Sequence, residues 1–343
     1  MIDNVPGIDR SLVEGGTVRE GILSTVGNTP LVQLVRLFPE FPSRLFVKLE
    51  RFNPGGSIKD RTALSMLRAK VESGELVPGR SVVVESSSGN LAIGLAQFCA
   101  YYAIRFICVV DPKTTRQNLA ILTAYHAEIE MVEHPDPVSG EYLPARQRRV
   151  RELCEQVPHA YRPDQYANPL NAAAQRQTMA EIVTALDGRI DYLFCSTGTC
   201  GTLVGCVGYL RDHGLSTRVV AVDAVGSAIF GDEPATRLIP GHGASVVPPL
   251  AVDATPDEIM HVSDLDCVVG CRLLLHREAI LAGGSSGATV SALRRRMADI
   301  PAGATAVLIL PDNGDRYLDT IYSDQWVSGH FGEITHLWKD ATC

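Results

Sequence analysis

Short apolar runs alternate with longer amphipathic segments along most of this chain. Strands are predicted at residues 45–50, 81–85, 106–111, 129–132, 192–195, 219–223 and 305–310, and helices at 62–72, 90–102, 115–126, 171–186, 202–213, 263–277 and 287–297. Apolar strands separated by helices are typical of parallel βαβ units, in which helices cover both faces of the sheet. The pattern predicts an α/β fold with mostly parallel, twisted sheets in three-layer domains.

The remaining segments carry weaker patterns. Residues 1–20 are expected to be irregular, 224–255 contain many Gly and Pro residues, and the segment from Ser328 is patterned weakly enough to be disordered. A basic helix is expected around Arg146, Arg148, Arg149 and Arg151, and most of these side chains would be solvated.

One apolar stretch, from Leu91 to Val110, is the nearest thing to a membrane span in the sequence. Gln97 and Arg105 interrupt it, and it divides into an amphipathic helix and a buried strand. We therefore expect no membrane association.

Length, charge and cysteine usage narrow the class of protein. A chain of 343 residues has room for two cores, and a net charge of −8 argues against nucleic acid or an anionic membrane surface as a partner. The nine cysteines lie in apolar segments, and Cys195, Cys200 and Cys206 lack the further ligands of a zinc site. The N-terminus has no signal-peptide pattern. We expect a cytoplasmic protein with reduced thiols and no metal.

The stretch Asn53-Pro54-Gly55-Gly56-Ser57-Ile58-Lys59 lies between a predicted strand and a predicted helix. A Pro-Gly-Gly turn bends sharply and lets the backbone approach a ligand. Lys59 would lie in the first turn of the helix, where the helix dipole disfavours its charged form. A neutral amine is what Schiff-base chemistry requires. On this segment alone, a solvated lysine in an ordinary turn is the alternative.

Further loops occur where a strand ends and a helix begins, which is where open α/β sheets bind ligands. Residues 85–91 (ESSSGNL) offer hydroxyls and backbone amides to a carboxylate or phosphate, although helix capping alone would explain one or two of them. Residues 196–202 (STGTCGT) suit a phosphate at a helix N-terminus, or simply a tight turn. They match neither a P-loop nor the GxGxxG fingerprint.

Residues 283–287 (GGSSG) formally satisfy G-x-S-x-G, the nucleophile elbow of α/β-hydrolases. Asp299, Asp312 or Asp315 followed by His330 or His336 would complete a triad in the right order. The segment before the motif is a poor core strand, however, and a hydrolase would leave Lys59 and the other loops unexplained.

Taken together and in this order, these motifs resemble those of the pyridoxal-phosphate enzymes of fold type II, in the cysteine synthase and cystathionine β-synthase branch. The resemblance runs from about Gly27 to Trp326. It rests on GNTPLV at 27–32, NPGGSIKDR at 53–61, SSGNLAIGLA at 87–96, the loop at 198–202 and GGSSGA at 283–288.

The resemblance implies a role for each matching residue. Lys59 would bind pyridoxal 5'-phosphate covalently and carry the Cα proton, Asn90 would hydrogen-bond the ring oxygen, and Ser285 would face the pyridine nitrogen. The phosphate group would be held by Gly198, Thr199, Cys200, Gly201 and Thr202. Ser87, Ser88 and Gln165 would hold the substrate carboxylate. The family also implies a homodimer, with a larger cofactor-binding domain (1–56 with 166–343) and a smaller, mobile substrate domain (57–165).

Finer features are similar to one subgroup, the N-(2-amino-2-carboxyethyl)-L-glutamate synthases. These enzymes join O-phospho-L-serine to L-glutamate. The reaction belongs to the biosynthesis of 2,3-diaminopropionate, which is used in siderophores and peptide antibiotics. The similar segments are 109–119, 131–137, 164–171, 222–232 and 310–326. The resemblance implies that Arg146 meets the leaving phosphate or a glutamate carboxylate, and Tyr166 matches as well.

Some residues depart from these patterns. Leu91 replaces a threonine and Cys200 a glycine of cysteine synthases, whereas Gly198 is the cysteine-synthase glycine and not the serine of the diaminopropionate enzyme. O-acetylserine therefore stays open as the donor, and a cysteine synthase or another β-replacement enzyme is the alternative function. A cofactor-binding sensor is a further alternative, which the intact Lys59 and Asn90 disfavour.

Overall fold

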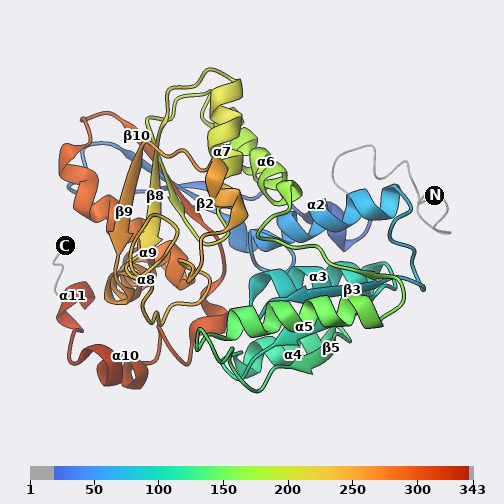
Figure 1. The fold of residues 1–343 in the computed structure, drawn as a ribbon. Coiled ribbons are helices and arrows are strands. Elements are labelled where there is room, and N and C mark those ends of the chain that lie inside the picture. The colour runs from blue at the N-terminus through green and yellow to red at the C-terminus, as the bar shows by residue number, and fades with distance from the viewer. Residues whose placement is uncertain (1–18, 340–343) are drawn as a thin grey trace.

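The computed structural model describes residues 19–339 and contains two β-sheets, each covered by helices (Figure 1). The strands are β1 (Leu31–Leu34), β2 (Arg44–Leu49), β3 (Val82–Ser86), β4 (Arg105–Val110), β5 (Glu128–Met131), β6 (Ala160–Tyr161), β7 (Tyr192–Ser196), β8 (Arg218–Ala224), β9 (Glu258–Val262) and β10 (Thr305–Leu310). The irregular segment expected at 1–20 lies outside the described residues, apart from its last positions.

The helices alternate with these strands along the chain. They are α2 (Lys59–Glu72), α3 (Asn90–Tyr101), α4 (Arg116–Ala124), α5 (Tyr142–Gln156), α6 (Pro169–Ala185), α7 (Gly201–Asp212), α8 (Asp264–Glu278), α9 (Gly284–Arg296), α10 (Asp324–Phe331) and α11 (His336–Lys339). Short 3-10 helices are η1 (Ile22–Thr25), η2 (Glu50–Phe52), η3 (Pro249–Asp253), η4 (Met297–Asp299) and η5 (Gly314–Tyr317).

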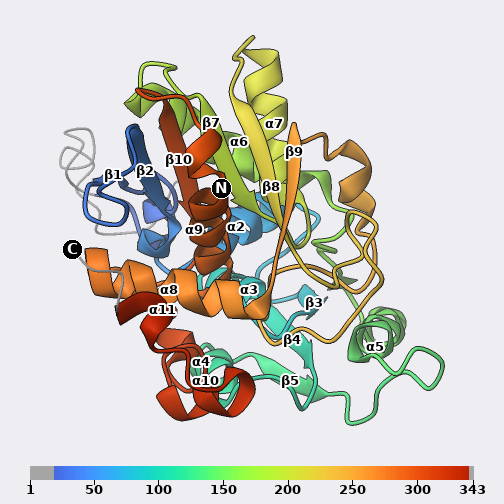
Figure 2. The same ribbon diagram turned by 90° about the vertical axis from the view of Figure 1, so that its left-hand side faces the viewer.

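The larger sheet has the strand order β1-β2-β10-β7-β8-β9 and is parallel except for β1. Helices α8 and α9 pack on one face and α6 and α7 on the other (Figure 2). Because both faces are covered, every residue of the central strand β10 is buried.

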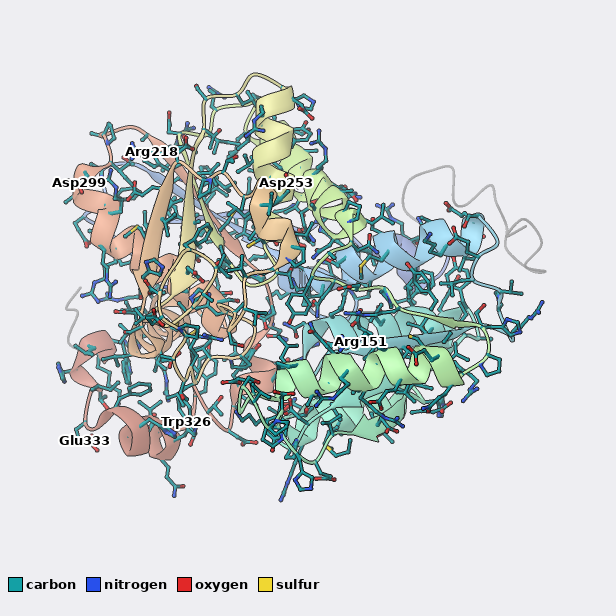
Figure 3. All side chains as sticks on the ribbon, in the orientation of Figure 1. Arg151, Arg218, Asp253, Asp299, Trp326 and Glu333 are labelled. Carbon is teal, nitrogen blue, oxygen red and sulfur yellow. The ribbon has the colours of Figure 1, made fainter. Side chains whose placement is uncertain are left out.

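The smaller sheet has the order β5-β4-β3-β6 and is parallel throughout. Helices α2, α3 and α4 cover one face, and α5 covers the other. The exposed Arg151 lies on α5, in agreement with a largely solvated basic helix (Figure 3). The division into a larger domain and a smaller, mobile domain at 57–165 stays a prediction.

The predicted α/β fold is confirmed, and most predicted elements lie within a few residues of the observed ones. The apolar stretch from Leu91 to Val110 forms α3 and β4, and no helix in residues 19–339 is long and apolar enough to cross a bilayer. The edge strands β6 and β9 were not predicted. Both are only partly buried, so neither shows a continuous apolar run.

The expected disorder after Ser328 is wrong for the part of that segment that is described. Helix α10 continues to Phe331, and α11 follows at His336–Lys339. Trp338 is 4% exposed and packs in the same cluster as α8, with the guanidinium of Arg272 over its ring. Tertiary contacts of one large side chain order a segment whose own periodicity is weak.

A buried cluster of charges joins the larger sheet to the start of α2. Arg61 makes ion pairs of 2.7 Å with both Glu50 and Glu181, and Lys48 lies 2.6 Å from Glu181. Although burial favours the neutral acid, the hydrogen bonds from Arg61 and Lys48 lower the pKa of Glu181 to about 2. Thr29 also donates a hydrogen bond to Glu50. Both oxygens of the Glu50 carboxylate, which is 0% exposed, therefore have partners.

Replacing Arg61 with methionine should therefore destabilise the protein strongly. Glu50 and Glu181 would lose their shared cation, and breaking a buried pair on one side costs about 3–5 kcal/mol. Chemical unfolding of Arg61→Met and wild type measures the difference. Arg105→Ala is the matched control, because Arg105 pairs with Glu128 at the surface and its loss should cost at most about 1 kcal/mol. Equal losses in both variants would contradict the prediction.

Candidate active site

All the predicted site residues line one cavity of about 940 Å³. They are Lys59, Ser87, Ser88, Asn90, Arg146, Gln165, Tyr166, Gly198, Thr199, Cys200, Gly201, Thr202 and Ser285. The cavity lies where strands of both sheets end, since the lining residues Ser87, Asp111, Thr197 and Pro311 directly follow β3, β4, β7 and β10. This is the edge of a parallel sheet at which α/β folds bind ligands.

Lys59 is the first residue of helix α2, as predicted from the turn before it. The turn is held by a hydrogen bond of 2.6 Å from the Gly55 backbone to Asp60, and a Cβ at Gly55 would come within 2.5 Å of the Asp60 carboxylate. Gly56 has a positive φ of 84°. Burial lowers the pKa of Lys59, and the carboxyl of Asp312 acts in the opposite direction. The net shift favours the neutral amine that a nucleophilic lysine requires.

The serine loop turns back on the N-terminus of α3. The Ser87 hydroxyl accepts a hydrogen bond from the Ala92 backbone, and the Ser88 carbonyl accepts one from Asn118. Asn90 begins α3 and its side-chain NH₂ donates to Asp312 over 2.8 Å. The loop is thus held in place and its polar groups line the cavity wall.

The glycine loop 198–202 opens helix α7, whose first N–H groups have no intrahelical partner. Cys200 has a left-handed backbone with φ 64°, a conformation that glycine adopts without strain. Cysteine synthases have glycine at this position, and this chain has cysteine instead. A Cβ at Gly201 would come within 2.3 Å of Asn171, and one at Gly198 within 3.0 Å of the Gly241 carbonyl. Glycine is therefore favoured at these two positions by close packing, in a loop at a helix N-terminus, which is where anions bind in many proteins.

Asn171 is a positioning residue that the sequence analysis missed. Its amide group donates to Thr199 of the glycine loop over 3.0 Å and to the Gln165 carbonyl over 2.8 Å, and it accepts from Thr62 on α2 over 3.0 Å. It is 1% exposed. One buried amide thus connects the segments that carry Lys59, Gln165 and the glycine loop, although in the sequence it is only one polar residue near the start of a helix.

Ser285 lies in the first turn of α9 and faces the cavity, but the nucleophile-elbow interpretation is wrong. The segment before it forms an isolated bridge between Ala282 and Asn313 and no strand. His330 and His336 are exposed, and neither lines the cavity. A hydrolase triad cannot form from these residues.

Asp312, Arg316 and Tyr317 complete the wall near Lys59. The Asp312 carboxyl accepts from Asn90 and, over 2.6 Å, from the Tyr317 hydroxyl, and burial raises its pKa. Arg316 donates to Asn90 and to the Gly55 carbonyl. The sequence analysis considered Asp312 only as a triad acid. Its position just after β10 could have identified it as a site residue, because polar residues that follow parallel strands gather at the edge of the sheet where ligands bind.

Arg146, Gln165 and Tyr166 also line the cavity. Arg146 has a side chain 12% exposed, and its Nε atom lies 3.2 Å from Asp111. Neither Nε nor Nη1 of Arg146 makes a hydrogen bond of normal geometry with another described residue. A buried guanidinium with unused donors is a receptor for an anion that the cavity admits.

The cavity fits the cofactor implied by the sequence motifs. A lysine whose pKa is lowered, a glycine loop at a helix N-terminus, and Asn90 and Ser285 line one space. Asp312 also keeps one buried oxygen, Oδ1, without a hydrogen-bond partner among the described residues. The donor set suits a phosphorylated aromatic aldehyde.

Comparisons with known proteins agree with this arrangement. The family model described as "pyridoxal-phosphate dependent enzyme" matches residues 22–312. The N-(2-amino-2-carboxyethyl)-L-glutamate synthase of Ralstonia nicotianae is 45% identical over 312 residues, which cover 91% of this chain and 92% of that protein.

Solved structures are similar over nearly the same range. An O-ureido-L-serine synthase superposes with a TM-score of 0.82 at 32% identity, over 91% of this chain and 99% of that one. An O-acetylserine-dependent cystathionine β-synthase from Helicobacter pylori gives 0.81 at 28% identity, over 90% of this chain and 100% of that one.

Proposed function

This chain belongs to the family of pyridoxal-phosphate-dependent enzymes, and we propose that it joins O-phospho-L-serine to the amine of L-glutamate with release of phosphate. It is a pyridoxal-phosphate-dependent β-replacement enzyme. The product of the proposed reaction is N-(2-amino-2-carboxyethyl)-L-glutamate, the compound after which the Ralstonia nicotianae relative is named.

The observation that carries the choice of donor is the buried Arg146. It keeps unused N–H donors on the wall of the cavity. Arginine binds phosphate through two parallel hydrogen bonds, which a neutral acetyl group cannot accept as well. Tyr166 lies beside it on the cavity wall, where burial raises the pKa of the hydroxyl and keeps it a neutral donor.

Each remaining site residue then has a proposed task. Pyridoxal phosphate, when bound, stabilises the negative charge that develops at the Cα of an amino-acid substrate. Asn90, Ser285 and the loop 198–202 would hold it. Lys59 would attach to it covalently, then remove the Cα proton of the donor as general base and later return it. Ser87, Ser88 and Gln165 would orient the substrate carboxylate.

The wider setting is also a proposal. We expect a cytoplasmic homodimer that supplies 2,3-diaminopropionate for a siderophore or peptide antibiotic. Residues 57–165 would close over the bound substrates and exclude water from the reacting atoms. A role as a cofactor-binding sensor is disfavoured because relatives similar over nearly the whole chain are named as synthases.

Gly198 favours a second candidate, a cysteine synthase or related enzyme that uses O-acetylserine, because cysteine synthases have glycine at this place. The similarity to an O-acetylserine-dependent enzyme points in the same direction. The two candidates differ in both donor and acceptor, so one set of measurements separates them.

We expect the purified holoenzyme to respond to O-phospho-L-serine with a change in the visible absorbance of its cofactor. L-glutamate should then restore the starting spectrum, and mass spectrometry should detect the joined product. The same titration with O-acetyl-L-serine and with sulfide provides the comparison. If only sulfide restores the spectrum, the enzyme is a cysteine synthase and the proposed acceptor is wrong.

Replacing Lys59 with alanine should abolish both turnover and covalent attachment of the cofactor, since this amine is the proposed nucleophile and base. Borohydride reduction followed by peptide mass spectrometry locates the attachment. Lys70→Ala is the matched control, because Lys70 is paired with Glu75 away from the cavity and its loss should leave attachment at Lys59 intact. Normal turnover by Lys59→Ala would sink the assignment.

Replacing Arg146 with leucine should raise the KM for O-phospho-L-serine roughly 10- to 100-fold, which corresponds to a charged hydrogen bond of about 1.5–3 kcal/mol. The KM for O-acetyl-L-serine should change far less. Arg148→Leu on the same helix is the control, since Arg148 is 49% exposed and bound to Asp136. An equal rise for both donors would show that Arg146 does not recognise the phosphate.

A further inference from the structure

His242 is a buried histidine in the wall of the active-site cavity that the roles described above do not use. It is 2% exposed and is the one histidine among the described residues that line this cavity. Neither of its ring nitrogens makes a hydrogen bond of normal geometry within the described chain. A buried polar ring without such bonds is costly unless a ligand completes them.

The backbone on both sides of His242 is built to hold it there. Gly241 and Gly243 have φ values of 76° and 71°, a left-handed conformation that favours glycine. The Gly243 N–H donates to the Thr197 carbonyl over 2.9 Å, and the Gly241 carbonyl lies 3.0 Å from the Cβ position of Gly198. His242 is therefore clamped against the residues that begin the glycine loop.

The ring is uncharged at neutral pH. Burial lowers the pKa of His242 to about 4, the Thr197 carbonyl opposes this effect, and the positive charge of Arg237 adds to it. A neutral imidazole always has one nitrogen with a free lone pair, and this nitrogen can accept a proton.

The proposed reaction has two protons to manage, and Lys59 can carry only one. Lys59 takes the Cα proton and must keep it for return to Cα. The α-amino group of the acceptor is mostly protonated at neutral pH and has no lone pair for attack until it loses a proton. Sulfide differs, because its monoanion attacks without losing one. An amine acceptor thus requires a second base, whereas sulfide does not.

We propose that His242 is this second base. It takes one proton from the acceptor ammonium, and the freed lone pair forms the N–Cβ bond in place of the C–O bond whose electrons leave with the phosphate. The resulting imidazolium passes its proton to phosphate or water. The inference rests on the proposed amine acceptor.

Two acidic groups of the cavity wall already have partners. Asp111 lies 3.2 Å from Arg146, and Asp312 accepts hydrogen bonds from Asn90 and Tyr317. Asp312 uses Oδ2 for both of these bonds and keeps Oδ1 free, whereas neither ring nitrogen of His242 makes a hydrogen bond of normal geometry within the described chain.

The test compares acceptors in a His242→Gln holoenzyme, with O-phospho-L-serine as the donor. We expect the rate with L-glutamate to fall by about 100-fold, the lower end of the usual contribution of a general base, because the low pKa of His242 makes it a weak one. The rate with sulfide should fall far less, and the absorbance change caused by the donor alone should persist. Raising the pH should recover part of the glutamate rate, because more of the amine is then unprotonated.

His276→Gln is the matched control, since His276 is exposed on α8 and does not line the cavity. Equal losses with glutamate and sulfide would mean that His242 is structural, and an unchanged glutamate rate would mean that it is not the base; either result overturns the proposal. If the wild-type enzyme forms no product with L-glutamate, the proposed function itself is wrong. The wild-type assay alone gives this result, so it is distinguishable from a failure of the role of His242.

His242→Asn gives a second, smaller polar replacement in case the glutamine variant does not fold.

A solvent isotope effect measured on the wild-type enzyme requires no substitution. It should be larger on the glutamate-dependent step than on the sulfide-dependent step, because both steps include proton return by Lys59 but only the first includes proton transfer from the ammonium group. Equal isotope effects on both steps would also overturn the proposal.

Discussion

The position of Lys59 depends on a buried cluster of charges next to it in the chain. Helix α2 has no side-chain cap at its N-terminus, where Ile58 precedes Lys59. Arg61, two residues further on, binds Glu50 after strand β2 and Glu181 on helix α6. Buried ion pairs add little net stability compared with apolar packing, but they tolerate few alternative geometries. The cluster fixes the backbone of Lys59 and leaves its side chain to the cavity.

Within the cavity, burial and charge act on Lys59 in opposite directions. Burial favours the neutral amine, and the nearby Asp312 favours the ammonium form. The same burial raises the pKa of Asp312, although hydrogen bonds from Tyr317 and Asn90 oppose it. Burial has the larger effect, so the amine form that binds an aldehyde is favoured, while Asp312 can stabilise the ammonium form when Lys59 carries a proton. The site keeps this balance with residues from α2, α3 and the loop after β10.

The sequence revealed the fold and most of the cavity because both follow local rules. Apolar runs locate strands such as β10, and small or polar residues after them locate loops such as 196–202. The edge strand β9 and the α11 segment lacked such signals, since their order depends on packing against β8 and α8. Asn171 shows the same limit within the site, because its role depends on partners from segments far apart in the chain.

His242 lies in the irregular stretch between β8 and β9, where neither periodicity nor a motif points to a function. Its proposed role follows from two facts: an ammonium acceptor must lose a proton, and the folded chain places His242 in the cavity wall. Burial and the positive charge of Arg237 keep the imidazole neutral before the acceptor arrives, so it does not repel the incoming ammonium group. The imidazolium formed by proton transfer would be short-lived there and would pass its proton to phosphate or water. Arg146 and His242 would then divide the chemistry between them. The cation would receive the anion that leaves, and the neutral base would receive the proton of the amine that replaces it.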